Sequence, residues 1–122
     1  MPGIATFALT ALDCPDPLGL ARFYSELTGW PIEDGSDAEW ATLKSPNGGP
    51  TIACQGVEDH RPPQWPGSEQ PQQLHLDFDV PDLDAGEQAV LAIGATKAEH
   101  QPGESFRVFL DPAGHPFCLV KV

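Results

Sequence analysis

The sequence predicts an α+β fold made of two tandem modules, each a strand, a helix and then two or three strands. Two turn motifs carry this prediction, because each occurs twice. Residues 13–16 (Asp-Cys-Pro-Asp) return at 79–82 as Asp-Val-Pro-Asp, and residues 46–50 (Pro-Asn-Gly-Gly-Pro) return at 112–116 as Pro-Ala-Gly-His-Pro. Both repeats have an offset of 66 residues (79 − 13 = 66 and 112 − 46 = 66), and six of the seven identities at this offset lie in these turns. A fixed offset across two separate turns indicates a duplicated structural unit.

Composition restricts the class of protein. The chain has 122 residues, of which 40% are apolar, and this suits one folded domain. A net charge of −12 disfavours nucleic acids and anionic membranes as partners, because phosphate groups select Lys and Arg. The apolar runs are too short for a transmembrane helix, and the first residues lack the pattern of a signal peptide. Three cysteines without metal-ligand spacing fit reduced thiols, so we expect a cytoplasmic protein.

The first copy begins with a predicted strand over residues 4–12, which are small and apolar. Asp16 is expected to cap a helix with Pro17 in its first turn, and Gly29 is expected to end that helix. Apolar residues at positions 20, 23, 24 and 27 have the spacing of one helix face. Residues 40–44 and 51–55 flank a Pro- and Gly-rich turn, which predicts a β-hairpin.

The second copy repeats this order. Residues 74–80 alternate strictly between apolar and polar, which predicts a strand with two different faces. Asp84 and Glu87 resemble a capping box that opens a helix, and Gly94 is expected to end it. The apolar face of this helix has smaller residues than its counterpart, which predicts closer packing on its sheet. Residues 106–110 and 117–121 flank the second turn and predict a second hairpin, with His115 at the surface of the turn.

A proline-rich segment separates the two copies. Such a segment forms neither a central strand nor a helix. It is long for a loop in a compact domain, and long loops are often functional or mobile. We therefore divide the single domain into module one (about 1–56), a linker (about 57–73) and module two (about 74–122).

Four segments together point to a known group of proteins. They are residues 13–16, residues 23–30 (Phe-Tyr-Ser-Glu-Leu-Thr-Gly-Trp), residues 75–84 (His-Leu-Asp-Phe-Asp-Val-Pro-Asp-Leu-Asp) and residues 109–117 (Phe-Leu-Asp-Pro-Ala-Gly-His-Pro-Phe). In type and order they resemble the motifs of the vicinal-oxygen-chelate superfamily, which includes glyoxalase I, bleomycin-resistance proteins and extradiol dioxygenases. The resemblance extends over nearly the whole chain and covers the linker least. It implies two βαβββ modules whose mixed sheets curl into a cup, the glyoxalase/bleomycin resistance-like fold, and a homodimer.

The resemblance also bears on metal binding. Metal-dependent members carry four ligands, one from the first strand and one from the last strand of each module. In copy two these positions hold His75 and Cys118, where Cys replaces the usual Glu, whereas the same offset gives Leu9 and Ile52 in copy one, which cannot bind a metal. A catalytic metal needs about three protein ligands and an open position. His75 and Cys118 fall short unless Asp77 contributes, so we expect no cofactor and disfavour a divalent metal.

His75 and Asp77 lie on the predicted polar face of their strand, which the resemblance points into the cup. They are the candidate catalytic pair, because a neighbouring carboxylate favours a protonated imidazole. Alternatively, His75 remains from an ancestral metal site and is held by a neighbouring polar group. Cys118 lies among apolar residues, which favours a buried thiol over a nucleophile.

Aromatic side chains are the candidates for ligand contact. Trp40 lies on a predicted strand. Trp65 lies in the linker, where no regular element requires a large ring, and it is expected to close over the cup or to plug a subunit interface. Alternatively, Trp65 packs against its own domain. Phe106, Phe109 and Arg107 fall on a strand expected to border the cup. An inward Arg107 would suit an anionic or carbonyl ligand, whereas an outward one would be solvated, and the sequence leaves this open. The predicted ligand site also includes three former metal positions: Leu9, Ile52 and Cys118.

The leading hypothesis is a metal-independent protein that binds a small apolar or aromatic metabolite or drug and acts by sequestration. The first alternative is a lyase, isomerase or dehydratase that uses His75 with Asp77 for proton transfer. Further alternatives are a metal-dependent lyase or dioxygenase with a degenerate ligand set, and a domain whose cup serves only dimerisation. Likeness of fold does not choose among these chemistries.

Overall fold

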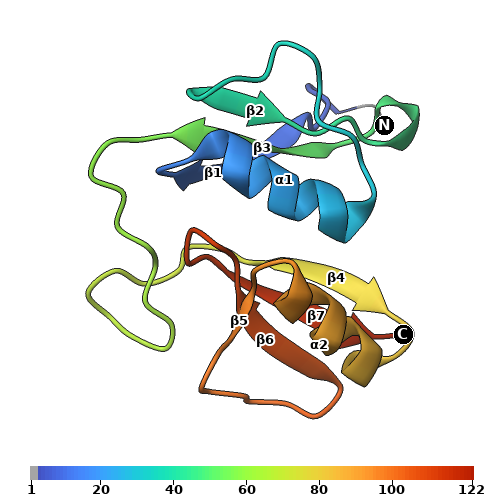
Figure 1. Ribbon diagram of the computed structural model, residues 1–122, viewed down its shortest axis with the longest axis vertical. Helices are drawn as coiled ribbons and strands as arrows, with labels where there is room; N and C mark the ends of the chain where they lie inside the picture. The colour runs from blue at the N-terminus through green and yellow to red at the C-terminus, as the bar shows by residue number, and fades with distance from the viewer. Residues whose placement is uncertain (1–2) are drawn as a thin grey trace. The chain divides into compact units, whose positions relative to one another are not determined.

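The computed structural model describes residues 3–122. The chain forms two compact units, one up to His60 and one from Arg61 to Val122. Each unit has one β-sheet and one α-helix that lies along it (Figure 1). Over residues 3–122, neither helix has the length and apolar character needed to cross a bilayer, since they contain 12 and 10 residues.

The sheet of the first unit has three strands. Its order is β1 (Leu9–Cys14), β3 (Thr51–Gly56) and β2 (Trp40–Thr42). β1 runs parallel to β3, and β2 runs antiparallel to it, which confirms the predicted hairpin. A short 3-10 helix, η1 (Pro46–Gly48), forms its turn.

The predicted first strand is displaced in the structure. β1 begins at Leu9, later than predicted, and continues through Asp13 to Cys14. It can continue this far because Pro15 is the first residue that cannot donate a backbone hydrogen bond to the neighbouring strand. The prediction that the strand stops at Leu12 is therefore wrong.

Helix α1 (Pro17–Thr28) has both of its predicted ends. The Asp16 side chain caps it by accepting a hydrogen bond from the Gly19 amide at 3.2 Å. Gly29 ends it with a φ of 77°, a left-handed conformation that glycine adopts without strain. The face that carries the predicted apolar residues is buried, and α1 lies against β3 and β2.

The sheet of the second unit contains the complete strand, helix and three strands. Its order is β4 (Leu76–Val80), β7 (Pro116–Lys121), β6 (Phe106–Leu110) and β5 (Thr96–Lys97). β4 is parallel to β7, whereas β7, β6 and β5 are antiparallel to one another. Helix α2 (Leu83–Ala92) lies against β7. The second hairpin is thus confirmed, and the common order β1-β3-β2 and β4-β7-β6 confirms the duplication.

The start of α2 differs from the prediction. Asp82 is the N-cap, and its side chain accepts hydrogen bonds from the amides of Asp84 (2.9 Å) and Ala85 (3.2 Å). The prediction that Asp84 caps this helix is wrong, because Asp82 is the residue that keeps an extended conformation just before the first helical turn. The repeat itself points to this residue, since Asp82 lies 66 positions after the cap Asp16.

Close packing of α2 on its sheet depends on Gly86. A Cβ atom at this position would lie 3.1 Å from Leu119 Cδ1 and 3.3 Å from Val80 Cγ1. These separations are tighter than ordinary van der Waals contacts, so a side chain here would push the helix away from β4 and β7. This agrees with the closer packing expected from the small residues of the second copy.

The pairing of the first strand with the last strand differs by one residue between the two units. In the first unit Ile52 pairs with Thr10, so a fixed offset of 66 residues would pair Cys118 with residue 76 (10 + 66 = 76). Cys118 instead pairs with Asp77, which corresponds to residue 11 of the first unit (77 − 66 = 11). Ala53, the partner of residue 11, is therefore the structural counterpart of Cys118. The pairing of Ile52 with Cys118, which the fixed offset predicted, is wrong.

The two repeated turns close by different contacts. In the second unit the Asp111 carboxylate accepts hydrogen bonds from the amides of Ala113 (2.8 Å) and His115 (3.0 Å). In the first unit the Ser45 hydroxyl donates to the Gly49 carbonyl instead. Because the turn sets the register of a hairpin, the different closures account for the slip. The His115 ring also binds Asp111 and is only 15% exposed, so its predicted surface position is wrong.

Candidate functional site

The second unit contains a pocket of about 420 Å³. Small-molecule sites commonly have volumes of roughly 300–1,000 Å³ and mostly apolar walls. The apolar lining residues are Trp65, Pro102, Phe106, Val108, Pro116 and Val120, and the polar ones are Gln72, His75, Asp77 and Cys118. The pocket therefore has apolar walls and a small set of polar groups.

Strand register explains why these side chains meet. In the sheet, Cys118 of β7 is flanked by Asp77 of β4 and by Val108 of β6. Neighbours in register point to the same face of a sheet, and alternate residues of each strand return to it. Phe106 and its partner Val120 therefore share this face as well. The strand residues on the polar and apolar sides of the pocket are therefore two regions of one sheet face.

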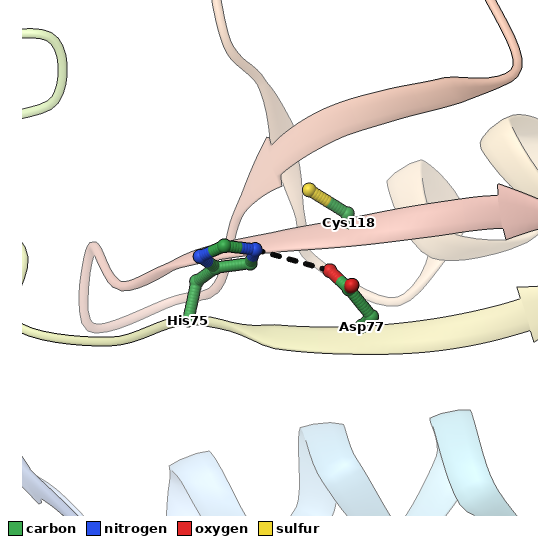
Figure 2. A group of neighbouring side chains, drawn as sticks. All are labelled: His75, Asp77 and Cys118. Carbon is green, nitrogen blue, oxygen red and sulfur yellow. Dashed lines mark ion pairs between the residues drawn. The ribbon is translucent and has the colours of Figure 1, made fainter.

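Three polar side chains form a cluster on this face (Figure 2). His75 immediately precedes β4, Asp77 lies near the start of that strand, and Cys118 comes from the neighbouring β7. The His75 Nε2 and Asp77 Oδ1 atoms are 3.2 Å apart, and the ligand atoms of all three residues lie within 4.8 Å of one another. The side chains of His75 and Asp77 are 44% and 55% exposed, whereas Cys118 is buried. A bound molecule can thus reach the imidazole and the carboxylate.

The Cys118 thiol is held in its protonated form. Burial raises its pKa to about 11, and the negative charge of Asp77 and a hydrogen bond with that carboxylate act in the same direction. A protonated thiol is a weak donor and a poor nucleophile. Burial and the neighbouring Asp77 carboxylate thus give a physical reason for the low reactivity expected of this thiol.

Alkylation of Cys118 by iodoacetamide is expected to be slow at pH 8, with a rate that rises until about pH 11. The thiolate is the attacking species, and peptide mass spectrometry separates Cys118 from the fully buried Cys14 and Cys54. Asp77→Asn should accelerate the reaction only in part, because burial is the larger cause of the raised pKa. Equal rates in the wild type and in Asp77→Asn would contradict this account.

The raised pKa of Cys118 also affects stability at alkaline pH. A thiol in the unfolded chain ionises near 9.0, whereas the folded protein keeps this proton up to about pH 11. Because the folded state then binds more protons than the unfolded state, the contribution of this thiol to stability is complete below pH 9 and is lost as the pH rises to 11.

The second half of the linker folds onto the second unit. No helix or strand forms between residues 57 and 73, as predicted. Trp65 nevertheless packs against the buried cluster of Ala98, Val108 and Cys118, and its ring centre lies 5.3 Å from that of His100. The linker thus provides a wall of the pocket. Trp65 packs on its own unit, as the alternative expected, and also lines the pocket, so its contact with a ligand stays a prediction.

Arg107 faces away from the pocket, which resolves the orientation that the sequence left open. Its Nη2 atom lies 2.9 Å from Asp84 Oδ1, and its Nη1 atom lies 3.0 Å from Glu87 Oε1, both on α2. The hydrogen bond to Asp84 raises the pKa of the guanidinium group. Phe109 lies on the same face, fully buried, with its ring stacked on Phe117 at 5.8 Å. Neither Arg107 nor Phe109 lines the pocket.

Three other predicted site residues belong to the first unit. Trp40 is 39% exposed on β2, and its indole donates a hydrogen bond to Thr42 Oγ1 at 2.7 Å. Ile52 is buried on the sheet face that it shares with Thr10. Leu9 begins β1 and is half-buried. The pocket of the second unit includes none of these three side chains.

Sequence reasoning missed several lining residues. Phe106 was expected on a strand that borders the cup, but Val108 was not named. It could have been found, because counting back from the centre of the second turn places it opposite Cys118. Gln72 had no comparable signal. It lies in the linker, and only the path of that segment over the second unit brings it to the pocket.

The fold family implies a metal site, and the side chains can be tested against it. The four-ligand arrangement is not reproduced, because the counterparts of His75 and Cys118 in the first unit are Leu9 and Ala53, which have no donor atoms. The second unit retains three donors close together, on His75, Asp77 and Cys118. A divalent ion bound by these three would have to displace the Cys118 proton. The side chains thus offer a partial ligand set.

The duplicated sheet-and-helix unit, with its first and last strands parallel and a pocket on the uncovered sheet face, defines a protein of the vicinal-oxygen-chelate fold. The family model of the glyoxalase-like domain matches residues 10–120, and the chain belongs to that family. No match was found among curated proteins.

Solved structures share this fold over nearly the whole chain. A glyoxalase/bleomycin resistance protein/dioxygenase family enzyme from Burkholderia phytofirmans PsJN has a TM-score of 0.73 at 17% identity, covering 97% of this chain and 99% of its own. A glyoxalase-related enzyme from Fulvimarina pelagi has a TM-score of 0.68 at 19% identity, covering 98% and 89%. A glyoxalase/bleomycin resistance protein from Albidiferax ferrireducens T118 has a TM-score of 0.63 at 21% identity, covering 95% and 98%. At these identities the likeness concerns the fold.

Proposed function

We propose that this protein binds a small apolar or aromatic metabolite or drug in the pocket of its second unit, and sequesters it without a metal ion. The pocket itself supports this proposal, since it has about 420 Å³ of space and walls that are mainly apolar. Removal of apolar ligand surface from water contributes about 25 cal/mol per Å². Burial against these walls is therefore a sufficient source of affinity, and no bond needs to be made or broken.

A thermal denaturation screen of metabolite-like and drug-like compounds tests this proposal. The matched variant is Val120→Trp, because Val120 is half-buried in the pocket wall and an indole there would occupy the space. A ligand at about 100 times its Kd adds about 2.7 kcal/mol to the free energy of unfolding. Some compounds should raise the Tm of the wild type but not that of the folded variant. No stabilising compound, or equal stabilisation of both proteins, would contradict the proposal.

A second candidate function is proton transfer by His75, and the 3.2 Å separation of His75 Nε2 and Asp77 Oδ1 favours it. A carboxylate in contact with an imidazole fixes the orientation of the ring, as proton transfer requires. The protein would then be a lyase, isomerase or dehydratase that acts on the bound molecule. His75→Asn should abolish turnover while thermal stabilisation by the ligand remains. Recovery of every bound compound unchanged from the wild type would leave sequestration as the function.

We also propose, from the family resemblance, that the protein forms a homodimer and works in the cytoplasm. Size-exclusion chromatography with light scattering tests the first point. A mass of one chain at every concentration up to the millimolar range would contradict a dimer.

A further inference from the structure

Fixed positive charge is missing from the part of the pocket lining that residues 3–122 form. Asp77 is its only carboxylate, and over residues 3–122 no Lys or Arg contributes to the lining. The thiol of Cys118 stays protonated and therefore neutral. A negatively charged ligand would meet Asp77 without a fixed counter-charge, whereas a positively charged ligand would be attracted to it.

Three basic residues on the strands of the second unit are directed away from the pocket. Arg107 is paired with Asp84 and Glu87 of α2, on the opposite face of the sheet. Lys97 is also paired with Glu87, at 3.1 Å between Nζ and Oε1. Lys121 follows Val120 on β7 and, by the alternation of the strand, points away from the pocket face. The anionic or carbonyl ligand considered for an inward Arg107 therefore has no partner here.

The polar side chains of the pocket offer both donors and acceptors, and only Asp77 is purely an acceptor. Gln72 Oε1 is buried and accepts no hydrogen bond from any residue between 3 and 122. The Asp77 carboxylate binds His75 and Cys118, and a carboxylate offers about four acceptor positions, so it can accept more. A buried acceptor without a donor is unfavourable. Gln72 Oε1 is out of reach of solvent, however, so Asp77 is the acceptor that a ligand in the pocket can reach.

The walls of the pocket require an apolar body on the same ligand. Trp65 and Phe106 contribute aromatic rings, and Pro102, Val108, Pro116 and Val120 contribute hydrocarbon. Aromatic faces also attract cations, since the ring carries negative charge density above its plane. The walls therefore suit an apolar part of the ligand, and the Asp77 carboxylate suits a positively charged part of the same molecule.

We propose that the ligand is an amine with an apolar or aromatic body, whose ammonium group binds the Asp77 carboxylate. This inference rests on the proposed function, because it specifies the class of molecule that the pocket takes. A metal ion would use the donors of His75, Asp77 and Cys118, but it would leave the apolar walls without a role. The amine uses both the carboxylate and the walls.

Three compounds of one shape test this proposal. Naphthylmethylamine is a cation, naphthylmethanol is neutral and naphthoate is an anion. Titration calorimetry at pH 8 in an amine-free buffer should show that the amine binds about tenfold more tightly than the alcohol, as expected for one additional hydrogen bond to a charged group. Naphthoate should bind more weakly than the alcohol.

Asp77→Asn removes the charge and keeps a side chain of the same shape. In this variant the amine should bind only as tightly as the alcohol, while the affinity for the alcohol stays within about threefold of that of the wild type. Asp79→Asn is the matched control, because Asp79 is exposed on the same strand face, two residues further along, and does not line the pocket. It should keep the preference for the amine, which excludes a general effect of the acidic surface.

Each outcome separates this inference from the proposed function. Equal affinities for amine and alcohol, or a preference for naphthoate, would overturn the ammonium site and leave the apolar pocket in place. Absence of binding by all three compounds would overturn both. Co²⁺ alone is the last probe: a thiolate-to-cobalt absorption band that disappears in Cys118→Ser, together with loss of amine binding when the ion is present, would identify a metal site and overturn the amine.

Discussion

Replacement of Asp111 by alanine is expected to lower the free energy of unfolding by about 3–5 kcal/mol, the usual loss when one partner of a buried pair is removed. Asp111 has a fully buried side chain. It accepts hydrogen bonds from the amides of Ala113 and His115, and its Oδ2 lies 2.8 Å from the His115 ring. The substitution removes the acceptor of all three donors at once. Urea denaturation measures the loss.

Two variants test the cause of this loss. Asp111→Asn keeps an oxygen for the two amides but removes the charge, so it should cost about half as much. Ser45→Ala is the matched control from the first copy, where one hydroxyl closes the same turn, and it should cost about 1 kcal/mol. Trp65 fluorescence in a background that lacks the other two tryptophans would report on the second unit. Equal losses in Asp111→Ala and Ser45→Ala would show that the buried carboxylate has no special role.

The closure of this turn also shows where sequence reasoning reached its limit. Local chemistry was sufficient for the hairpins and for both ends of α1, because Asp16, Gly29 and the proline-rich turns act on neighbouring residues. The repeat fixed the order of the elements. It did not fix the register, because a one-residue slip depends on how Asp111 or Ser45 closes the turn, and both residues are compatible with one motif.

The candidate site was predictable only where a local pattern decides the direction of a side chain. Strict alternation along residues 74–80 placed His75 and Asp77 on one face, and the structure brings Cys118 to them. The direction of the Arg107 side chain depended on the position of α2, because Asp84 and Glu87 of that helix form ion pairs with its guanidinium group. That position is a tertiary feature, and no local pattern encodes it.

The structure of the linker was the hardest to predict from the sequence, and this segment contributes residues to the pocket that no pattern indicated. Gln72 lies in it without any periodicity, and Trp65 was noticed only because a large ring there had no local explanation. Their places follow from the contact of the linker with the second unit, for example the approach of Pro62 to Gly114, where an added Cβ would lie 2.5 Å from Pro62 Cβ. Such contacts join residues that are far apart in the sequence.

Removal of the Trp65 indole is expected to weaken the binding of naphthylmethanol by roughly 30-fold, equivalent to about 2 kcal/mol, as for an aromatic residue central to a binding site. Trp65 lines the pocket and packs on its buried cluster. A tryptophan buries about 150–250 Å², and alanine leaves this part of the wall open to water. Titration calorimetry of Trp65→Ala against the wild type measures the loss. The neutral alcohol makes the result independent of any charge on the ligand.

Two further tryptophan variants decide whether the loss concerns the ligand or the fold. Trp65→Phe keeps an aromatic wall, so its affinity should fall only about threefold. Trp40→Ala removes an indole of the same size from the first unit, where it is bound to Thr42. An equal weakening in Trp40→Ala would mean that the ligand contacts both units, as a cup shared by the two modules requires. Unchanged affinity in Trp65→Ala would instead show that this ring only packs against its own unit, and that the bound molecule is held by the strands alone.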